Sequence, residues 1–229
     1  MGCRKTVLRA ARAVVGVATG FLVGCSAVSL SSLWSGSPST VGSWTTVGGG
    51  TFTTTNVAYT SVAINKTTGT PYVAFEDGAA GAAVTVKRYS GGTWGYVGSA
   101  GFSGVTAESV HIAGAPDGTL YVAYTHPSAG LYYANVMSYT PATGWLPVGS
   151  ADFVQLSTSW TATALALDPG GTPFLAYRDS TLDRVVVQEW TGSSWMAVGS
   201  SSSFNTGPSN ISLAVDSGGN PWVAYEDGG

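Results

Sequence analysis

Charged residues are scarce in this chain. They make up 9% of its 229 residues, against about a quarter in ordinary globular domains. This scarcity excludes a disordered chain, which combines high charge with few aromatic residues. It also excludes a helical bundle, whose exposed faces carry many Glu, Lys and Arg. Cysteine is nearly absent too, with two residues.

Glycine and aromatic residues, by contrast, are abundant. The chain has 32 Gly, 8 Trp, 11 Tyr and 7 Phe. Together with Ser and Thr, these residues suit short strands joined by tight turns. No long segment has the period of an amphipathic helix. The composition therefore predicts an all-β protein.

The basic residues are concentrated at the N-terminus. An apolar run over 13–24 follows them. A basic start and a short apolar run are the layout of a secretory signal, and the run is too short for a stable membrane span. We therefore predict a signal peptide over 1–24. The basic residues before the run, four of the nine in the chain, are Arg4, Lys5, Arg9 and Arg12.

The apolar run ends in Leu22-Val23-Gly24-Cys25, which resembles the lipobox of bacterial lipoproteins. The resemblance implies cleavage before Cys25 and a diacylglyceryl group on its sulfur. Two alternatives stay open. The start Met1-Gly2-Cys3-Arg4-Lys5-Thr6 fits a myristoylation pattern, with Cys3 as a palmitoylation site. The same segment also fits an ordinary signal or an uncleaved anchor, with Cys25 as a bystander.

Removal of residues 1–24 makes the chain distinctly acidic. It leaves five cations against all twelve acids, a net charge of −7. No basic patch remains for phosphates, so we expect no nucleic-acid partner. With Cys25 acylated no disulfide forms, and packing alone holds the fold. Residues 25–42 are Ser-rich and form a tether to the membrane. The expected location is the bacterial cell envelope, outside the cytoplasm, and the outer membrane if the source is Gram-negative.

The rest of the chain repeats about every fifty residues. Four tryptophans stand just before a Val-Gly pair, 50, 51 and 50 residues apart, and a phenylalanine follows each. A second motif recurs as PYVAFED, LYVAYTH, PFLAYRD and PWVAYED. Motifs that keep one order in every copy indicate a repeat architecture. The aromatic residues are Trp44, Trp94, Trp145, Trp195, Phe52, Phe102, Phe153 and Phe204.

Each full repeat contains four strand-like segments. In the first repeat they cover 61–65, 71–77, 84–89 and 93–97, with turn-rich joints between them. Four short antiparallel strands per repeat describe the blade of a β-propeller. We therefore predict β-propeller repeats over 43–229. The expected blades cover about 61–98, 109–149, 162–199 and, incompletely, 210–229.

Three resemblances agree with this architecture. Residues 139–145 resemble the hairpin between the last two strands of a kelch blade, although acidic residues replace the glycine pair of kelch repeats. The turns at 117–119 and 216–219 resemble the Asp-box turns of sialidases, without the full Asp-box pattern. The repeat as a whole resembles those of bacterial surface proteins with propeller domains. These resemblances imply an architecture rather than an activity.

About three and a half blades are present. The sequence stops after two strands of the last one, which would leave a long strand edge unpaired. We therefore expect a fragment of a larger propeller. The alternative is a compact four-bladed ring in which the strand around Trp44 completes the last blade.

One face of the propeller is the expected ligand face. The loop after each second strand and the long loop that enters the next blade open on the same side, and loops on a rigid scaffold carry function. Polar residues end every second strand, and one entering loop holds an aromatic candidate. The candidate residues are Glu76, Asp77, His126, Trp160, Arg178, Asp179, Glu226 and Asp227.

Other interpretations of these residues are structural. Tryptophans and phenylalanines that recur in every blade indicate packing between blades. The Glu-Asp pairs fit acceptors for turn amides. They also fit catalytic carboxylates, but neighbours on a strand point to opposite faces, so such a pair must come from different blades. Two histidines, His111 and His126, do not make a zinc site. We expect no cofactor; calcium is possible, although no EF-hand loop is present.

Three functions follow as hypotheses. The first is a lipid-anchored surface module, not an enzyme, that binds glycan or protein through the loop-bearing face. The second is a secreted glycan-active enzyme of sialidase-like design. It needs an arginine cluster, for which the sequence offers Arg178 and Arg184. The third is a rigid scaffold of an envelope complex. Regular repeats favour binding over catalysis.

Overall fold

The computed structural model describes residues 46–48, 52–156, 163–179, 181–199 and 208–226, and the backbone of residues 5–9. The predicted lipidation residue Cys25 and the candidate ligand residues Trp160 and Asp227 lie outside these ranges. The described chain consists of antiparallel strands, with a short 3-10 turn at Gly78–Ala80. The all-β prediction is confirmed.

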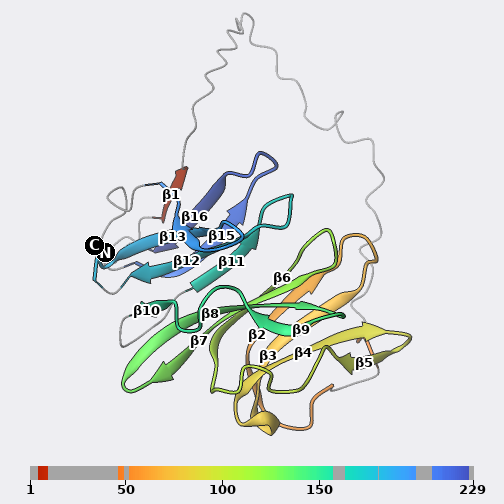
Figure 1. Cartoon of the computed structure of the whole chain (residues 1–229). Helices are drawn as coiled ribbons and strands as arrows, with labels where there is room; N and C mark the ends of the chain where they lie inside the picture. The colour runs from red at the N-terminus through yellow and green to blue at the C-terminus, as the bar shows by residue number, and fades with distance from the viewer. Residues whose placement is uncertain are drawn as a thin grey trace, which may run out of the picture.

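The first blade is a four-stranded antiparallel sheet in the order β2-β3-β4-β5 (Figure 1). Its strands are β2 (Val57–Ile64), β3 (Pro71–Asp77), β4 (Ala83–Ser90) and β5 (Thr93–Tyr96). The predicted segments coincide with these strands to within a residue at most ends. The exception is β2, which begins four residues early because its register shifts between Ala58 and Ser61 and the strand continues past the bulge.

The second and third blades repeat this order. Their strands are β6 (Glu108–Gly114), β7 (Leu120–Ser128), β8 (Leu131–Thr140), β9 (Gly144–Pro147), and β11 (Thr163–Leu167), β12 (Pro173–Asp179), β13 (Arg184–Trp190), β14 (Trp195–Ala197). The extra strand β10 (Val154–Leu156) pairs with both β8 and β12 and so joins the two blades into one sheet. The sequence motifs did not predict β10, which lies in a loop between blades.

The last blade pairs β15 (Ser209–Val215) with β16 (Pro221–Glu226). The strand β1 (Lys5–Arg9) lies on the free side of β16, where the other blades have their third strand (Figure 1). Trp44, whose strand completes this blade in the alternative four-bladed ring, lies outside the described residues. β1 lies within residues 1–24, the segment predicted to be cleaved. Its pairing with β16 therefore belongs to the chain before cleavage, and the cleavage itself stays a prediction.

The core lies between neighbouring blades. One cluster joins the first and second blades, a second joins the second and third, and a third joins the third to the last. Phe75, Leu120 and Leu175 are among the largest fully buried side chains. Each such side chain stabilises the fold by about 1.5–3 kcal/mol relative to an exposed one.

The repeated tryptophans form hydrogen bonds to the preceding repeat. Trp145 Nε1 donates to the carbonyl oxygen of Val97 at 2.8 Å, and its ring stacks on Phe102 with centroids 3.9 Å apart. Trp94 and Trp195 make the equivalent bonds at 3.1 and 2.9 Å, and stack on the equivalent phenylalanines. This confirms that these aromatic residues pack between blades.

Candidate functional site

Two of the predicted ligand residues hold turns instead. The Asp77 carboxylate is buried and accepts hydrogen bonds from Thr85 Oγ1 at 2.9 Å and from the amide of Ala79 at 3.0 Å. The Asp179 carboxylate accepts from the amides of Thr181 and Leu182 at 2.9 and 2.7 Å. Both carboxylates therefore have the turn-holding role that the sequence left open as an alternative.

Two further predicted residues are engaged in ion pairs. His126 Nε2 lies 2.7 Å from Asp152 Oδ1, and Asn135 Nδ2 donates to the same oxygen at 3.0 Å. Burial raises the pKa of Asp152, but the hydrogen bonds from Asn135 and His126 outweigh it and leave that pKa lowered. Arg178 Nε donates to Asp183 Oδ1 at 2.7 Å. Arg178 is thereby paired with a carboxylate of its own blade.

Glu226 ends the second strand of the last blade. Its Oε2 accepts from Asn210 Nδ2 at 2.6 Å and from Ser209 Oγ at 3.2 Å. Asn210 stands at a bulge of β15 and has φ +50°. The glutamate is therefore tied to the first strand of its own blade.

The equivalent glutamate of the first blade has different surroundings. Glu76 lies near Glu108, and the two belong to neighbouring blades, since β3 ends near Glu76 and β6 begins at Glu108. Burial raises the pKa of Glu76, and the charge of Glu108 raises it further. Sequence reasoning required a carboxylate pair to come from different blades, and the structure brings such a pair together.

Two tyrosines complete this group. Burial raises the pKa of Tyr59, and the nearby Glu108, Glu76 and Tyr132 raise it further. Tyr59 occupies the bulge of β2 with φ +48° and is 46% exposed. Bulges re-aim side chains next to functional sites. We call Tyr59, Glu76, Glu108 and Tyr132 the acid-tyrosine cluster.

The side chains of the acid-tyrosine cluster have no bonding partners among the described residues. Within the described ranges, no hydrogen bond or ion pair joins any of these side chains to another residue. Asp77, His126, Arg178, Asp179 and Glu226 on the same side of the blades are all engaged. Of the predicted ligand residues that the structure describes, Glu76 is thus the one without such a bond.

Sequence reasoning missed Tyr59, Glu108 and Tyr132. None belongs to a repeated motif, because each differs from its counterparts in the other blades. A difference from the residues at the equivalent positions of the other repeats was the sequence signal that could have identified these three residues. Glu108, for instance, is the first residue of the first strand of its blade, three residues before His111. A carboxylate at this position does not contribute to the hydrophobic core.

The first strand of the second blade also carries His111. Burial lowers the pKa of His111, and a hydrogen bond with the backbone of Thr163 partly restores it. Ser109 Oγ lies 2.8 Å from Thr163 Oγ1 and 3.4 Å from His111 Nε2. These contacts join the first strands of two blades, and they give His111 a place in the scaffold.

Among the described residues, no three His, Cys, Asp or Glu side chains gather closely enough to hold a metal ion. No helix in the described ranges is both long and apolar enough to span a membrane.

Comparison with known proteins gives a fold but no family. No protein-family model matches the chain, and no curated protein matches it. The fucose-specific lectin from Aleuria aurantia is 18% identical, with a TM-score of 0.54, and the match covers 73% of this chain and 53% of the lectin. The Hadza microbial sialidase Hz136 is 17% identical, with a TM-score of 0.48, and the match covers 70% of this chain and 37% of the sialidase.

An enzyme in complex with galactose also matches. The exo-β-1,3-galactanase from Phanerochaete chrysosporium is 15% identical, with a TM-score of 0.40 in its galactose complex, over 74% of this chain and 46% of the enzyme. The chain spans less than two thirds of the length of each of these structures. Identities this low show the fold alone, and the lectin match supports a propeller-like, all-β architecture.

Proposed function

We propose that this protein is a lipid-anchored β-propeller that binds glycans at its loop-bearing face, in the acid-tyrosine cluster. The observation that carries the proposal is that these four side chains from two blades lie near one another and have no hydrogen-bond or ion-pair partner among the described residues. The equivalent positions of the other blades are taken up by bonds that hold the scaffold. A rigid scaffold with one uncommitted polar group is the usual construction of a binding site.

The chemistry of the acid-tyrosine cluster suits a saccharide. Carboxylates accept hydrogen bonds from sugar hydroxyls, and each tyrosine supplies both a hydroxyl and an apolar ring. The protein is acidic, and the cluster itself carries two carboxylates, which disfavours an anionic ligand. The structural likeness to a fucose-specific lectin agrees with a glycan ligand.

Catalysis on a glycan is the second candidate function, and one observation favours it. Glu76 and Glu108 come from different blades, and the raised pKa of Glu76 is what a general acid requires. Glycosidases use two carboxylates, of which one donates a proton to the leaving oxygen. A sialidase-like version lacks support from Arg178, which is paired with Asp183.

The anchor belongs to the same proposal. Acylation of Cys25 and removal of residues 1–24 would tether the propeller to the bacterial cell envelope through the Ser-rich segment 25–42. Stable anchoring needs more than one acyl chain, which the lipoprotein modification supplies. The kelch-like hairpin and the total number of blades also stay predictions.

A glycan array probed with the purified protein tests the proposal. We expect binding to a neutral glycan, weakened about tenfold or more by Glu108→Gln, since a charge-assisted hydrogen bond is lost. Glu189→Gln, at the other end of the blades, is the matched control and should leave this binding unchanged. Absence of binding to any glycan would contradict the proposal.

A panel of fluorogenic glycosides separates the two candidate functions. Turnover that disappears in Glu76→Gln would establish the enzyme and overturn the binding-only function. Binding without turnover would support the binding module. Binding to a protein partner alone would contradict both glycan functions.

A further inference from the structure

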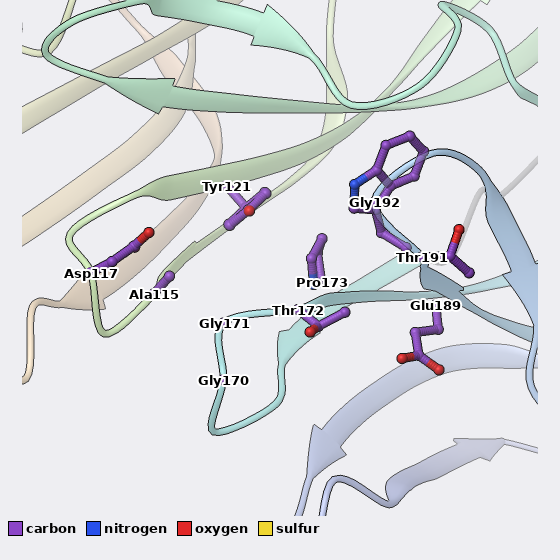
Figure 2. A pocket seen from close by; sticks show the side chains of 11 residues that line it. Ala115, Asp117, Tyr121, Gly170, Gly171, Thr172, Pro173, Glu189, Thr191 and Gly192 are labelled. Carbon is purple, nitrogen blue, oxygen red and sulfur yellow. The ribbon is translucent and has the colours of Figure 1, made fainter.

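A hollow of about 420 Å³ lies between the second and third blades. Tyr121, Asp117, Glu189 and Trp190 are among the residues that line it. In Figure 2, Tyr121 and Asp117 lie on one side and Glu189 on the other, with Pro173 between them. The volume falls within the range of roughly 300–1,000 Å³ typical of small-molecule sites.

This hollow is distinct from the acid-tyrosine cluster. It is formed by the turns before β7 and β12 and by the end of β13. Tyr121 stands near the start of β7, whereas His126, on the predicted ligand face, stands five residues further along the strand. That separation is about 16 Å at the rise of an extended strand. The two sites therefore open at opposite ends of the blades.

The walls of the hollow are fixed by close packing. Gly171 has φ +94°, and a Cβ on it would meet Ala115 Cβ at 3.0 Å, so the turns of the two blades touch here. The Trp190 ring packs on Trp195, with centroids 5.6 Å apart. A preformed hollow of this kind needs little ordering when a ligand binds.

Several polar groups in the hollow have no hydrogen-bond partner among the described residues. Within the described part of the chain, no hydrogen bond engages the Glu189 carboxylate, the Trp190 indole N–H or the Tyr121 hydroxyl. The Asp117 carboxylate accepts from Thr119 N and Oγ1 at 2.9 and 3.0 Å, and a carboxylate has room for further donors. Burial raises the pKa of Tyr121, and the charge of Asp117 raises it further.

The polar residues of the hollow are not all set by the repeated motifs. Glu189 pairs across the sheet with Phe174, and the residues in the same register of the first two blades are Arg88 and Ser138. A glutamate at this position is therefore particular to the third blade. Among the described residues that line the hollow there is no lysine or arginine, so its two carboxylates favour a cationic ligand.

We propose that this hollow is a second binding site, for a sugar that carries a free amino group. The ammonium would donate to Glu189 on one side of the hollow, and a sugar hydroxyl would donate to Asp117 on the other side. Other hydroxyls would accept from Trp190 Nε1–H and the Tyr121 hydroxyl, and the sugar ring would lie on the aromatic side chains. An ammonium over an aromatic face gains a cation–π attraction as well. The proposal stands on this hollow and does not require glycan binding at the acid-tyrosine cluster.

Calorimetric titration with the glucosamine trimer tests the proposal, with the N-acetylglucosamine trimer as the uncharged counterpart. We expect the amine form to bind at least about tenfold more tightly. Glu189→Gln should weaken its binding about tenfold, since the variant keeps the side chain's shape and loses its charge. Trp190→Phe should weaken it while keeping the ring against Trp195.

Glu108→Gln is the control that separates the two sites, because it changes a carboxylate at the other end of the blades. It should leave the amino sugar bound as in the wild type, even if it abolishes binding on the glycan array. Unfolding midpoints of the variants verify that each is folded. Equal binding of both trimers, binding of neither, or an unchanged affinity in Glu189→Gln would overturn the proposal.

Discussion

Adjacent residues in one repeated motif have opposite roles in this protein. Asp77 is 5% exposed and holds its turn through Thr85 and Ala79. Its neighbour Glu76 points to the other face of the strand, where it meets Glu108 of the next blade and has no partner among the described residues. The alternation of a strand thus divides a Glu-Asp pair into one scaffold residue and one candidate ligand residue.

Loss of the Asp77 carboxylate should destabilise the first blade. Asp77→Ala leaves the buried Thr85 hydroxyl without its acceptor and removes the cap of the following turn. We expect a loss of about 1–3 kcal/mol in the free energy of unfolding, measured by urea denaturation. Glu76→Gln is the matched control and should change stability little. Equal losses for the two variants would contradict this assignment of roles.

The candidate site could be predicted in part from single residues. The sequence identified Glu76 because it ends a recurring motif, and it required a second carboxylate from another blade. It could not identify Glu108 or Tyr59, because the meeting of two blades and the bulge at Tyr59 arise only when the sheets are placed side by side. Nor could it show that Arg178 is paired with Asp183, since the loop between them sets that contact.

At the level of strands and turns, the repeat makes the fold predictable. The PYVAFED segment gives β3 with its predicted bounds, because alternation and turn residues mark both ends. The bulges in β2, β6 and β15 were not predictable, since Tyr59, Ser109 and Asn210 share no residue type that favours positive φ. The bridging strand β10 was missed because three residues form it and its pairing depends on both neighbouring blades.

The Val-Gly pair before each long loop should be sensitive to substitution. Gly98 has φ +73°, and a Cβ there would lie 2.7 Å from Trp145 Cδ1. Gly91 has φ +61° with open space around it. We expect Gly91→Ala to cost about 1 kcal/mol through backbone strain, and Gly98→Ala to cost about 1–3 kcal/mol more through the clash. Thermal unfolding measures both, and equal costs would contradict the packing role of Gly98.

The turn between β15 and β16 should make stability depend on pH. Hydrogen bonds from Trp222 Nε1, Asn220 and Gly218 lower the pKa of Asp216 to about 2. An unfolded aspartate has a pKa of about 3.9. Because the folded value is lower, the stabilisation is present above about pH 4 and is lost as the pH falls through about 2.

Urea denaturation of wild type and Asp216→Asn over this pH range measures that contribution. The wild type should be the more stable of the two near neutral pH, and the difference should shrink from about pH 4 to about pH 2. A difference that stays constant over the whole range would contradict the role of the ionised carboxylate.

At the level of the whole molecule, the proposed lipid anchor on Cys25 and the proposed tether over 25–42 would hold the blades at the cell envelope. Labelling with radioactive palmitate in a bacterial host tests the anchor. We expect the wild type to be labelled and to sediment with membranes, and Cys25→Ser to be unlabelled. A labelled Cys25→Ser would assign the acyl group to another residue, such as Cys3, and an unlabelled wild type would exclude the lipid anchor.

The blades also determine how the two proposed sites relate. The acid-tyrosine cluster joins the first and second blades, and the hollow joins the second and third at the opposite end. Both depend on contacts between blades, so a change that separates blades should affect both ligands. Changes to single carboxylates should affect one ligand each.

Glycans are proposed to bind where Glu76 and Glu108, carboxylates of two neighbouring blades, meet. The measurement that tests this proposal most directly is calorimetric titration of the tightest glycan from the array against wild type, Glu76→Gln, Glu108→Gln and the double variant. We expect each single variant to bind the glycan more weakly than the wild type. The two losses of binding free energy should not add up in the double variant, because both side chains contact one ligand. Full wild-type affinity in all three variants would contradict the proposal.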